Sequence, residues 1–458
     1  MTRAHVRLAA LTLLLAAQAG LLGAGTRASD PGLRDEPPGA GNPLPGLTAS
    51  QLALFQAGQD DFAEADDLAA GLGPRFNLDS CGGCHSQPAN GGTSPAVNPQ
   101  VAVATAFGAR NVVPVFLTAD GPVREARFKY KADGTRDGGV HALFVISGRV
   151  DPSGDASRCN IRQEDFQAQA RAGNVIFRIP TPTFGLGLIE QIPDRAIVAN
   201  QAAYGYRKVA LGIGGRPHRI RMTGTTNQNG NDGTIARFGW KAQNKSLLLF
   251  SGEAYNVEMG ITNELFQTER DETPSCQLAP TPNNITQTDG ATGIDTLSDI
   301  EKFALFMRFL APPTPSLTAP GGAPSIASGR MLFETVGCAL CHTPALMTGN
   351  AAVAAMRNQP VNLFSDLLLH QMGPGLADDI VQAQAGPDEF RTAPLWGLGQ
   401  RIFFLHDGRT SDLLVAIQAH YSPRNSRFQA SEANGVVNDF NRLSEAQKQD
   451  ILNFLRSL

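Results

Sequence analysis

Two five-residue segments decide how this sequence is interpreted: Cys81-Gly82-Gly83-Cys84-His85 and Cys338-Ala339-Leu340-Cys341-His342. In such a segment, two thiols one helical turn apart can add to the two vinyl groups of one porphyrin, and the next histidine can bind its iron. A zinc site would need more Cys or His close by, and a redox dithiol has no need of the histidine. The segments therefore predict two covalently bound haem c groups, attached at Cys81, Cys84, Cys338 and Cys341, with His85 and His342 as iron ligands.

The N-terminus has the pattern of a secretory signal peptide. Arg3 and Arg7 give a basic start, residues 8–25 are largely apolar, and Thr26-Arg27-Ala28 places small residues where a signal peptidase reads. We therefore predict that residues 1–28 are removed near Ala28 and that the protein is periplasmic. The alternative is that this N-terminal segment stays uncleaved as a membrane anchor. No later segment approaches about 18 uninterrupted apolar residues, so we expect no stable membrane insertion by the rest of the chain.

The formal net charge of the 458-residue chain is −4, and this mild acidity argues against nucleic-acid binding, which needs a basic surface. Outside the two haem motifs, only Cys159 and Cys276 remain of the six cysteines. In an exported chain this leftover pair predicts a disulfide, with two free buried thiols as the alternative.

The order of elements along the chain resembles two cytochrome c domains in series. Thr48-x-x-Gln51 opens a predicted helix ahead of the first motif, and Ser298-x-x-Glu301 and Ser444-x-x-Gln447 open helices that follow the two motifs. We predict a mainly α fold with two cytochrome c-like haem domains, the first enlarged by a long insertion with β-strands and loops. The predicted boundaries are a flexible leader over 29–47, an N-terminal domain over 48–313 with its insertion at about 105–285, a linker over 314–327 and a C-terminal domain over 328–458.

The insertion is predicted from length, because the chain between the first motif and its closing helix is far longer than one compact domain needs. Runs rich in β-branched and aromatic residues predict its strands. These runs are 112–116, 142–150, 174–179, 220–223 and 246–250.

The sixth ligand of each iron decides between electron transfer and catalysis, because a histidine or methionine there closes the iron to other molecules. The remaining candidates are His141, His218, His370, His406 and His420, together with Met347, Met356 and Met372.

Several segments carry a resemblance to known proteins. Phe404-Leu405-His406-Asp407-Gly408 is similar to the Phe-His-Asp-Gly segment of bacterial di-haem cytochrome c peroxidases and the related MauG enzymes, with Leu405 interrupting the pattern. Four further segments resemble the di-haem oxidoreductase family of peroxidase-like proteins. These are residues 391–399, 368–373, 184–190 and 237–242.

The resemblance implies ligands at matching positions. In the peroxidases, an axial Met of the C-terminal haem follows the Phe-His-Asp-Gly histidine, and here the ligand-capable residue in that place is His420. We therefore expect His342 and His420 to bind the second iron, with a surface or core position for His420 as the alternative. The distal histidine that the peroxidases have soon after the first motif is missing, so His141 becomes the best candidate for a sixth ligand or catalytic distal base. A structural, hydrogen-bonded role for His141 is the alternative.

The resemblance implies an exported di-haem oxidoreductase of the cytochrome c peroxidase type, in which the first haem reacts with peroxide and the second relays electrons. A small donor cytochrome or a cupredoxin is the expected partner, peroxide or another small oxidant the substrate, and a calcium ion is compatible with the sequence. The alternatives are an electron carrier without catalysis, and a MauG-like or oxygenase-like enzyme acting on an organic or protein substrate. Trp240 and Trp396 are candidates for the electron path between the haems.

Overall fold

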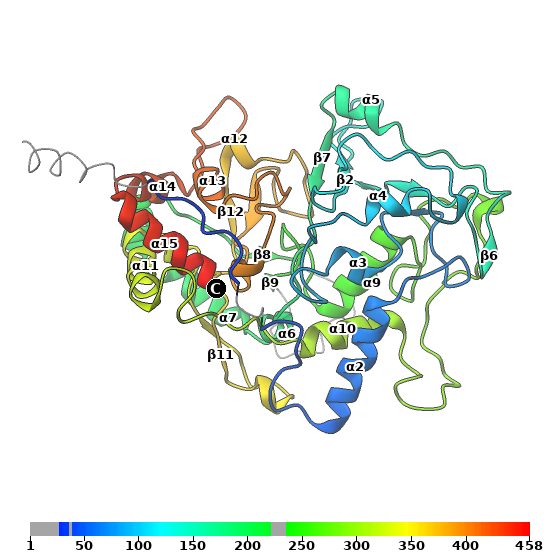
Figure 1. Ribbon diagram of the computed structural model, residues 1–458, viewed down its shortest axis with the longest axis horizontal. Coiled ribbons are helices and arrows are strands. Elements are labelled where there is room, and N and C mark those ends of the chain that lie inside the picture. The colour runs from blue at the N-terminus through cyan, green and yellow to red at the C-terminus, as the bar shows by residue number, and fades with distance from the viewer. Residues whose placement is uncertain (1–26, 36–38, 221–234) are drawn as a thin grey trace, which may run out of the picture.

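The computed structural model of the protein describes residues 27–35, 39–220 and 235–458 (Figure 1). The fold is mixed, with 32% helix and 11% strand in several small sheets, so the expectation of a mainly α protein needs correction. The predicted signal peptide up to residue 26 lies outside the described residues. In the part of the chain that the structure describes, no helix combines the length and apolar character needed to cross a bilayer.

Five of the described helices are longer than ten residues. The helices are α2 (Ala49–Ala63), α3 (Cys81–Cys84), α4 (Gln100–Val103), α5 (Phe166–Arg171), α6 (Leu186–Glu190), α7 (Asp194–Ala202), α8 (Gly205–Leu211), α9 (Leu247–Met259), α10 (Asp299–Phe309), α11 (Ala323–Val336), α12 (Gly373–Leu376), α13 (Leu413–Gln418), α14 (Asn434–Asn441) and α15 (Glu445–Ser457). Single 3-10 turns are η1 (Ala106–Gly108), η2 (Pro274–Cys276), η3 (Cys338–Leu340), η4 (Ala354–Met356) and η5 (Leu398–Gln400).

The strands are short and pair in antiparallel fashion. They are β1 (Arg75–Phe76), β2 (Glu125–Phe128), β3 (Val140–His141), β4 (Phe144–Val145), β5 (Val150–Asp151), β6 (Gly154–Asp155), β7 (Val175–Arg178), β8 (His218–Arg219), β9 (Ile235–Ala236), β10 (Leu346–Met347), β11 (Pro360–Val361), β12 (Leu369–Gln371) and β13 (Glu389–Arg391). The only three-stranded sheet among the described residues has the order β3-β2-β7.

Two helix pairs repeat the same packing. Helix α2 packs on α10 in the first half of the chain, and α11 packs on α15 in the second. All three predicted capping boxes form: Thr48 begins α2, Ser298 begins α10 and Ser444 begins α15. Each box satisfies two backbone N–H groups that a helix start leaves unpaired, which explains why these helices begin where the sequence predicts.

A glycine sits at the centre of each helix crossing. A Cβ on Gly58 would lie 2.2 Å from the carbonyl oxygen of Lys302, and a Cβ on Gly329 would lie 1.9 Å from that of Asp450. Two more glycines lie equally close to the ends of α10 and α15. A Cβ on Gly187 would lie 1.9 Å from Arg308 O, and a Cβ on Gly399 would lie 2.1 Å from Arg456 O. These backbones approach so closely that no side chain fits, and the recurrence marks two structurally matched units. We call α2, α3 and α10 the first unit, and α11, η3 and α15 the second unit.

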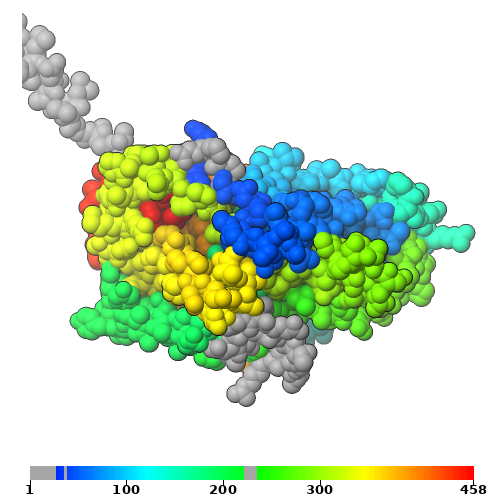
Figure 2. All heavy atoms as spheres, turned by 90° about the horizontal axis from the view of Figure 1, so that it is seen from below, coloured from blue at the N-terminus to red at the C-terminus, as the bar shows by residue number. Residues whose placement is uncertain are grey.

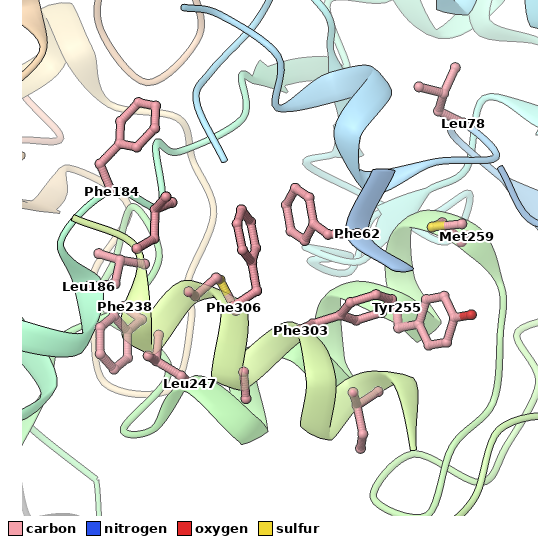
Figure 3. Packing of buried hydrophobic residues seen from close by; sticks show 14 of the residues in the cluster. Phe62, Leu78, Phe184, Leu186, Phe238, Leu247, Tyr255, Met259, Phe303 and Phe306 are labelled. Carbon is pink, nitrogen blue, oxygen red and sulfur yellow. The ribbon is translucent and has the colours of Figure 1, made fainter. Parts of the chain in front are cut away.

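Each unit has its own apolar core. Figure 3 shows Phe62 of α2 beside Phe303 and Phe306 of α10, with Tyr255 and Met259 of α9 nearby. The second core contains Phe333 of α11 and Phe454 of α15, whose ring centroids are 5.4 Å apart. In Figure 2 the yellow residues of the last third of the chain lie beside the blue residues of the N-terminal part.

The region expected to be an insertion is partly helical. Residues 175–178 form β7, and the run at 142–150 contains β4 and the first residue of β5, but residues 112–116 form no strand. The predicted strand at 246–250 is wrong, because Leu247 begins α9, capped by the side chain of Ser246. A short apolar run has the same pattern in a buried strand and in a buried helix, so periodicity could not separate them. Of the run at 220–223, residues 221–223 lie outside the described residues.

The disulfide expected between Cys159 and Cys276 is present. The segment expected to be a flexible leader is held by both units, because Asp30 pairs with the buried Arg456 at 2.6 Å and Leu44 N donates to Phe309 O at 2.7 Å. A buried guanidinium needs a counter-charge, and residues 27–35 supply it to α15.

Candidate functional site: two cavities behind the Cys-x-x-Cys-His motifs

The first motif forms one helical turn. Ser80 caps α3 by accepting from Gly83 N, and His85 N donates to Cys81 O at 3.0 Å. This turn brings Cys81, Cys84 and His85 to the wall of a cavity of about 150 Å³. The His85 Nδ1 lies 2.9 Å from Gly92 O, which fixes the Nδ1–H tautomer and leaves Nε2 free to bind a metal.

The second motif repeats this arrangement. His342 N donates to Cys338 O at 2.9 Å, and His342 Nδ1 lies 3.1 Å from Phe364 O. Cys338, Cys341 and His342 line a second cavity, of about 220 Å³. In both units the phenylalanine four residues after the crossing glycine faces the motif histidine, with Phe62–His85 ring centroids 5.9 Å apart and Phe333–His342 centroids 6.4 Å apart.

The second cavity contains another histidine, His420, whose Nδ1 is held by a backbone carbonyl as the Nδ1 of His342 is. His420 follows α13, its Nδ1 lies 2.8 Å from Ala416 O, and its ring lines the same cavity as His342. Burial and the neighbouring His420 lower the pKa of His342 to about 4, and burial lowers the pKa of His420. Both imidazoles are therefore neutral, which is the form that binds iron.

Buried arginines line both cavities. Burial lowers the pKa of Arg391 and of Arg401 to about 10 in the second cavity, and no described carboxylate forms an ion pair with either. In the first cavity, the Nε atoms of Arg124 and Arg178 are buried without a hydrogen-bond partner. Arg178 is already paired with Asp378, whereas Arg124, Arg391 and Arg401 form no ion pair with a described carboxylate. Buried cations without a paired anion fit the two propionates of a haem, so the residues present in each cavity suit that group.

A pair of neighbouring carboxyl groups distinguishes the first cavity from the second, where the acidic lining residue Glu432 pairs with His370. Glu258 of α9 and Glu125 of β2 line it and share a hydrogen bond. Burial and the charge of Glu125 raise the pKa of Glu258 to about 8, whereas Arg127 and Arg178 overcome burial and lower the pKa of Glu125. The pair therefore carries one proton at neutral pH, held on Glu258.

The first cavity owes this chemistry to the β2–β7 pairing and to α9. Glu125 lies opposite Arg178 in the register of the two strands, and Arg127 forms an ion pair with Glu125. Asn77 Nδ2 donates to Glu258 Oε2 at 2.6 Å and keeps that side chain in place. Sequence reasoning missed Glu125, Glu258 and the arginines because no local motif marks them. The one available signal was an alternating Glu125-x-Arg127 pair, which places both side chains on the same face of a strand.

The structure does not bring His141 to either cavity. Its Nε2 lies 2.9 Å from Asp137 and its Nδ1 3.7 Å from Glu164, and its ring stacks on Phe128. His218 and His370 also have both ring nitrogens engaged, His218 by backbone groups and His370 by Asp366 and Glu432. Among the described residues lining the first cavity, His85 is the only histidine.

The remaining candidate ligands are dispersed. His406 lines the second cavity, where burial lowers its pKa to about 4 and its ring stacks on Phe390 at 4.3 Å. Met372 lines the same cavity, Met356 is buried in the core of the first unit, and Met347 is half exposed on β10.

Trp240 contributes to the walls of both cavities. Its Nε1 donates to Ile179 O at 2.9 Å, and its ring meets His406 edge-on with centroids 6.4 Å apart. The adjacent Lys241 pairs with the buried Asp378, which also pairs with Arg178 of the first cavity. Trp396 lines neither cavity and packs beside Gly185.

The family described as "Di-haem oxidoreductase, putative peroxidase" matches residues 123–458, about three quarters of the chain, beginning after the first motif. No curated protein matches the chain.

The solved structures that match parts of the chain include the following two. One is hydrazine synthase from Kuenenia stuttgartiensis, with 18% identity, a TM-score of 0.23, and coverage of 36% of this chain and 56% of that chain. The other is a MauG-like protein associated with microbial copper homeostasis, with 16% identity, a TM-score of 0.30, and coverage of 61% of this chain and 90% of that chain.

Proposed function

The chain belongs to the di-haem oxidoreductase family, and on that premise we propose that it is an exported peroxidase-like enzyme with two covalently bound haem c groups. Cys81, Cys84 and His85 would hold the haem at which peroxide is reduced. Cys338, Cys341, His342 and His420 would hold the haem that serves electron transfer. The two cytochrome c-like domains span 48–313 and 328–458, joined by the linker over 314–327.

One observation carries this proposal: the two cavities differ in what they offer beside the motif histidine. The second cavity offers His420, which closes an iron and favours electron transfer. The first offers no second histidine among its described lining residues, and it presents the Glu125–Glu258 pair. Met259 and Met307 also line this cavity, and in this proposal neither binds the iron. An open position beside a proton donor is the arrangement that catalysis on peroxide requires.

A haem, when bound, supplies the iron that passes electrons to the O–O bond of peroxide. The chain supplies the proton. Glu258 holds it next to the ionised Glu125, so Glu258 can donate it to the departing oxygen and Glu125 can accept a proton from the incoming peroxide. Arg127 and Arg178 stabilise the negative charge that the pair carries after donation.

Electrons pass between the cavities by way of Trp240 in this proposal. The indole lies in both cavity walls, and its hydrogen bond to Ile179 O fixes its orientation. The buried Arg178–Asp378–Lys241 ion pairs hold the two walls together at the same place.

We further propose a periplasmic location and a small donor cytochrome or cupredoxin as the source of electrons. The Cys159–Cys276 disulfide supports an oxidising compartment.

The test is spectroscopic and kinetic. EPR and optical spectra of the purified protein should show one low-spin haem and one that is high-spin or reactive with peroxide. Glu258→Gln should lower peroxide turnover about 10²- to 10⁴-fold, the usual contribution of a general acid. Glu269→Gln is the matched control, because Glu269 is a buried carboxyl whose pKa is also raised to about 8 but which lines neither haem cavity. If both haems are low-spin and their spectra do not change when peroxide is added, the protein is an electron carrier instead.

A further inference from the structure

Tyr255 lines the first cavity but has no part in the proton chemistry above. It lies on α9, is 2% exposed, and meets Phe303 edge-on with ring centroids 5.1 Å apart. Figure 3 shows the ring beside Phe303, with Met259 above it and Phe62 close by. The other four tyrosines, Tyr130, Tyr204, Tyr206 and Tyr421, are 38–93% exposed and line neither cavity. Tyr255 is thus the tyrosine that the fold places at a haem site.

Two carboxyl groups face the Tyr255 hydroxyl. Its oxygen lies 3.1 Å from Asp66 Oδ2 and 3.3 Å from Asp299 Oδ2. Asp299 is further satisfied by Asn284, whose Nδ2 donates to the same oxygen at 2.7 Å, and by Lys302 at 3.6 Å from the other oxygen. A phenol has one proton to donate and cannot satisfy two carboxylates at once. Asp66 is the carboxyl with fewer partners of its own, which makes it the better proton acceptor.

The acidity of Asp66 suits that role. Burial and the charge of Asp299 raise its pKa to about 7. A proton can therefore move onto Asp66 and off it again at neutral pH. A phenol that loses an electron becomes a strong acid, so a carboxylate already at hydrogen-bond distance removes the main barrier to that oxidation.

We propose that Tyr255 is a one-electron donor to the first haem site, with Asp66 taking the phenolic proton as the electron leaves. The O–H bond of Tyr255 breaks, an O–H bond forms on Asp66, and a neutral tyrosyl radical remains. A haem in the first cavity, once oxidised by peroxide, would accept that electron. This inference rests on the proposed function, since peroxide is the terminal oxidant.

The experiment uses the full-length protein with both haems, in a background where the four exposed tyrosines are changed to Phe. In this background a tyrosyl EPR signal can come only from Tyr255. Samples are frozen within milliseconds to seconds of adding hydrogen peroxide, and a second series uses flash-generated ruthenium(III) tris-bipyridine in place of peroxide. Optical spectra of the haem bands are recorded on the same samples.

We expect a tyrosyl signal in the background protein, its complete loss in Tyr255→Phe, and at least a tenfold lower yield in Asp66→Asn, which keeps the size of Asp66 but cannot take the proton. Haem bands that respond to peroxide, with no tyrosyl signal from either oxidant, would overturn the inference and leave the proposed function standing. If the haem bands do not change with peroxide and a Tyr255 signal arises only with ruthenium, the proposed function is overturned. Tyr255 would then remain the oxidisable residue. An Asp66→Asn yield equal to that of the background would remove Asp66 from the proposal.

Discussion

The two units share the same helix crossing but differ in the residues that face the motif histidine. In each, a glycine lets two helices cross in backbone contact, a phenylalanine one turn on faces the motif histidine, and a backbone carbonyl holds the histidine Nδ1. These shared features, which we call the frame, position the motif histidine in each unit. What faces that histidine comes from residues outside the frame.

Those outer residues have different origins in the two units. In the second, His420 follows α13, close in sequence to the closing helix α15. In the first, Glu125, Arg178 and Glu258 come from strands β2 and β7 and helix α9, all in the long region between the motif and α10. The longer region thus supplies the carboxyl pair of the first cavity.

The largest expected effect is the loss of one covalent haem when the cysteines of one motif are replaced. Replacing Cys81 and Cys84 with Ser, or Cys338 and Cys341 with Ser, should remove one covalent haem each time, because each pair anchors one porphyrin. Mass spectrometry and haem staining after denaturation measure this. A Cys159/Cys276 double Ser variant is the control: it should lose about 2–5 kcal/mol of stability and retain both haems. If either motif variant keeps two haems, the units are not both attachment sites.

His420→Ala sharpens the contrast between the cavities. Removing the second imidazole should convert the second haem from low-spin to high-spin and leave the first unchanged. EPR at low temperature resolves the two signals. His141→Ala should change neither spectrum, because His141 lies outside both cavities. An unaltered spectrum for His420→Ala would rule out that ligand.

The shared frame can be tested at its crossing glycines. Gly58→Ala and Gly329→Ala should each lower the free energy of unfolding by about 1–3 kcal/mol, because the added Cβ overlaps a partner-helix carbonyl. Gly205→Ala is the control, since Gly205 begins α8 with open space around it. Thermal unfolding of the three variants gives the comparison, and a loss confined to one unit would show that the match between them is superficial.

The acidic pair of the first cavity should also produce a pH dependence of stability. The pKa of Glu258 is about 8 in the folded protein against an ordinary 4.5, so the folded state binds the extra proton between these values. Stability should therefore fall as pH rises from about 4.5 to about 8. Glu258→Gln should flatten that slope in melting temperatures measured across the range. A slope that the substitution leaves intact would assign the dependence to other groups, such as Asp66 or Glu269.

Local signals in the sequence predicted the frame well. Capping boxes at Thr48, Ser298 and Ser444 marked three helix starts, because capping depends on residues within one turn. The resemblance to known enzymes suggested that His420 pairs with His342, and the structure places both in one cavity. The leftover cysteines gave the disulfide. The strand predicted at 246–250 was wrong, because α9 is buried and a buried apolar run has no distinctive period.

By itself the sequence determined the two motifs, their histidines and the helices that frame them, since each depends on residues a few positions apart. Only the tertiary structure decided what each cavity contains. Glu125 and Glu258 are separated by 133 positions and meet because β2, β7 and α9 converge on the first motif. His141, the first choice from the sequence, is held away by Asp137 and Phe128. A proton shared between distant side chains is a property of packing and burial, and no spacing along the chain encodes it.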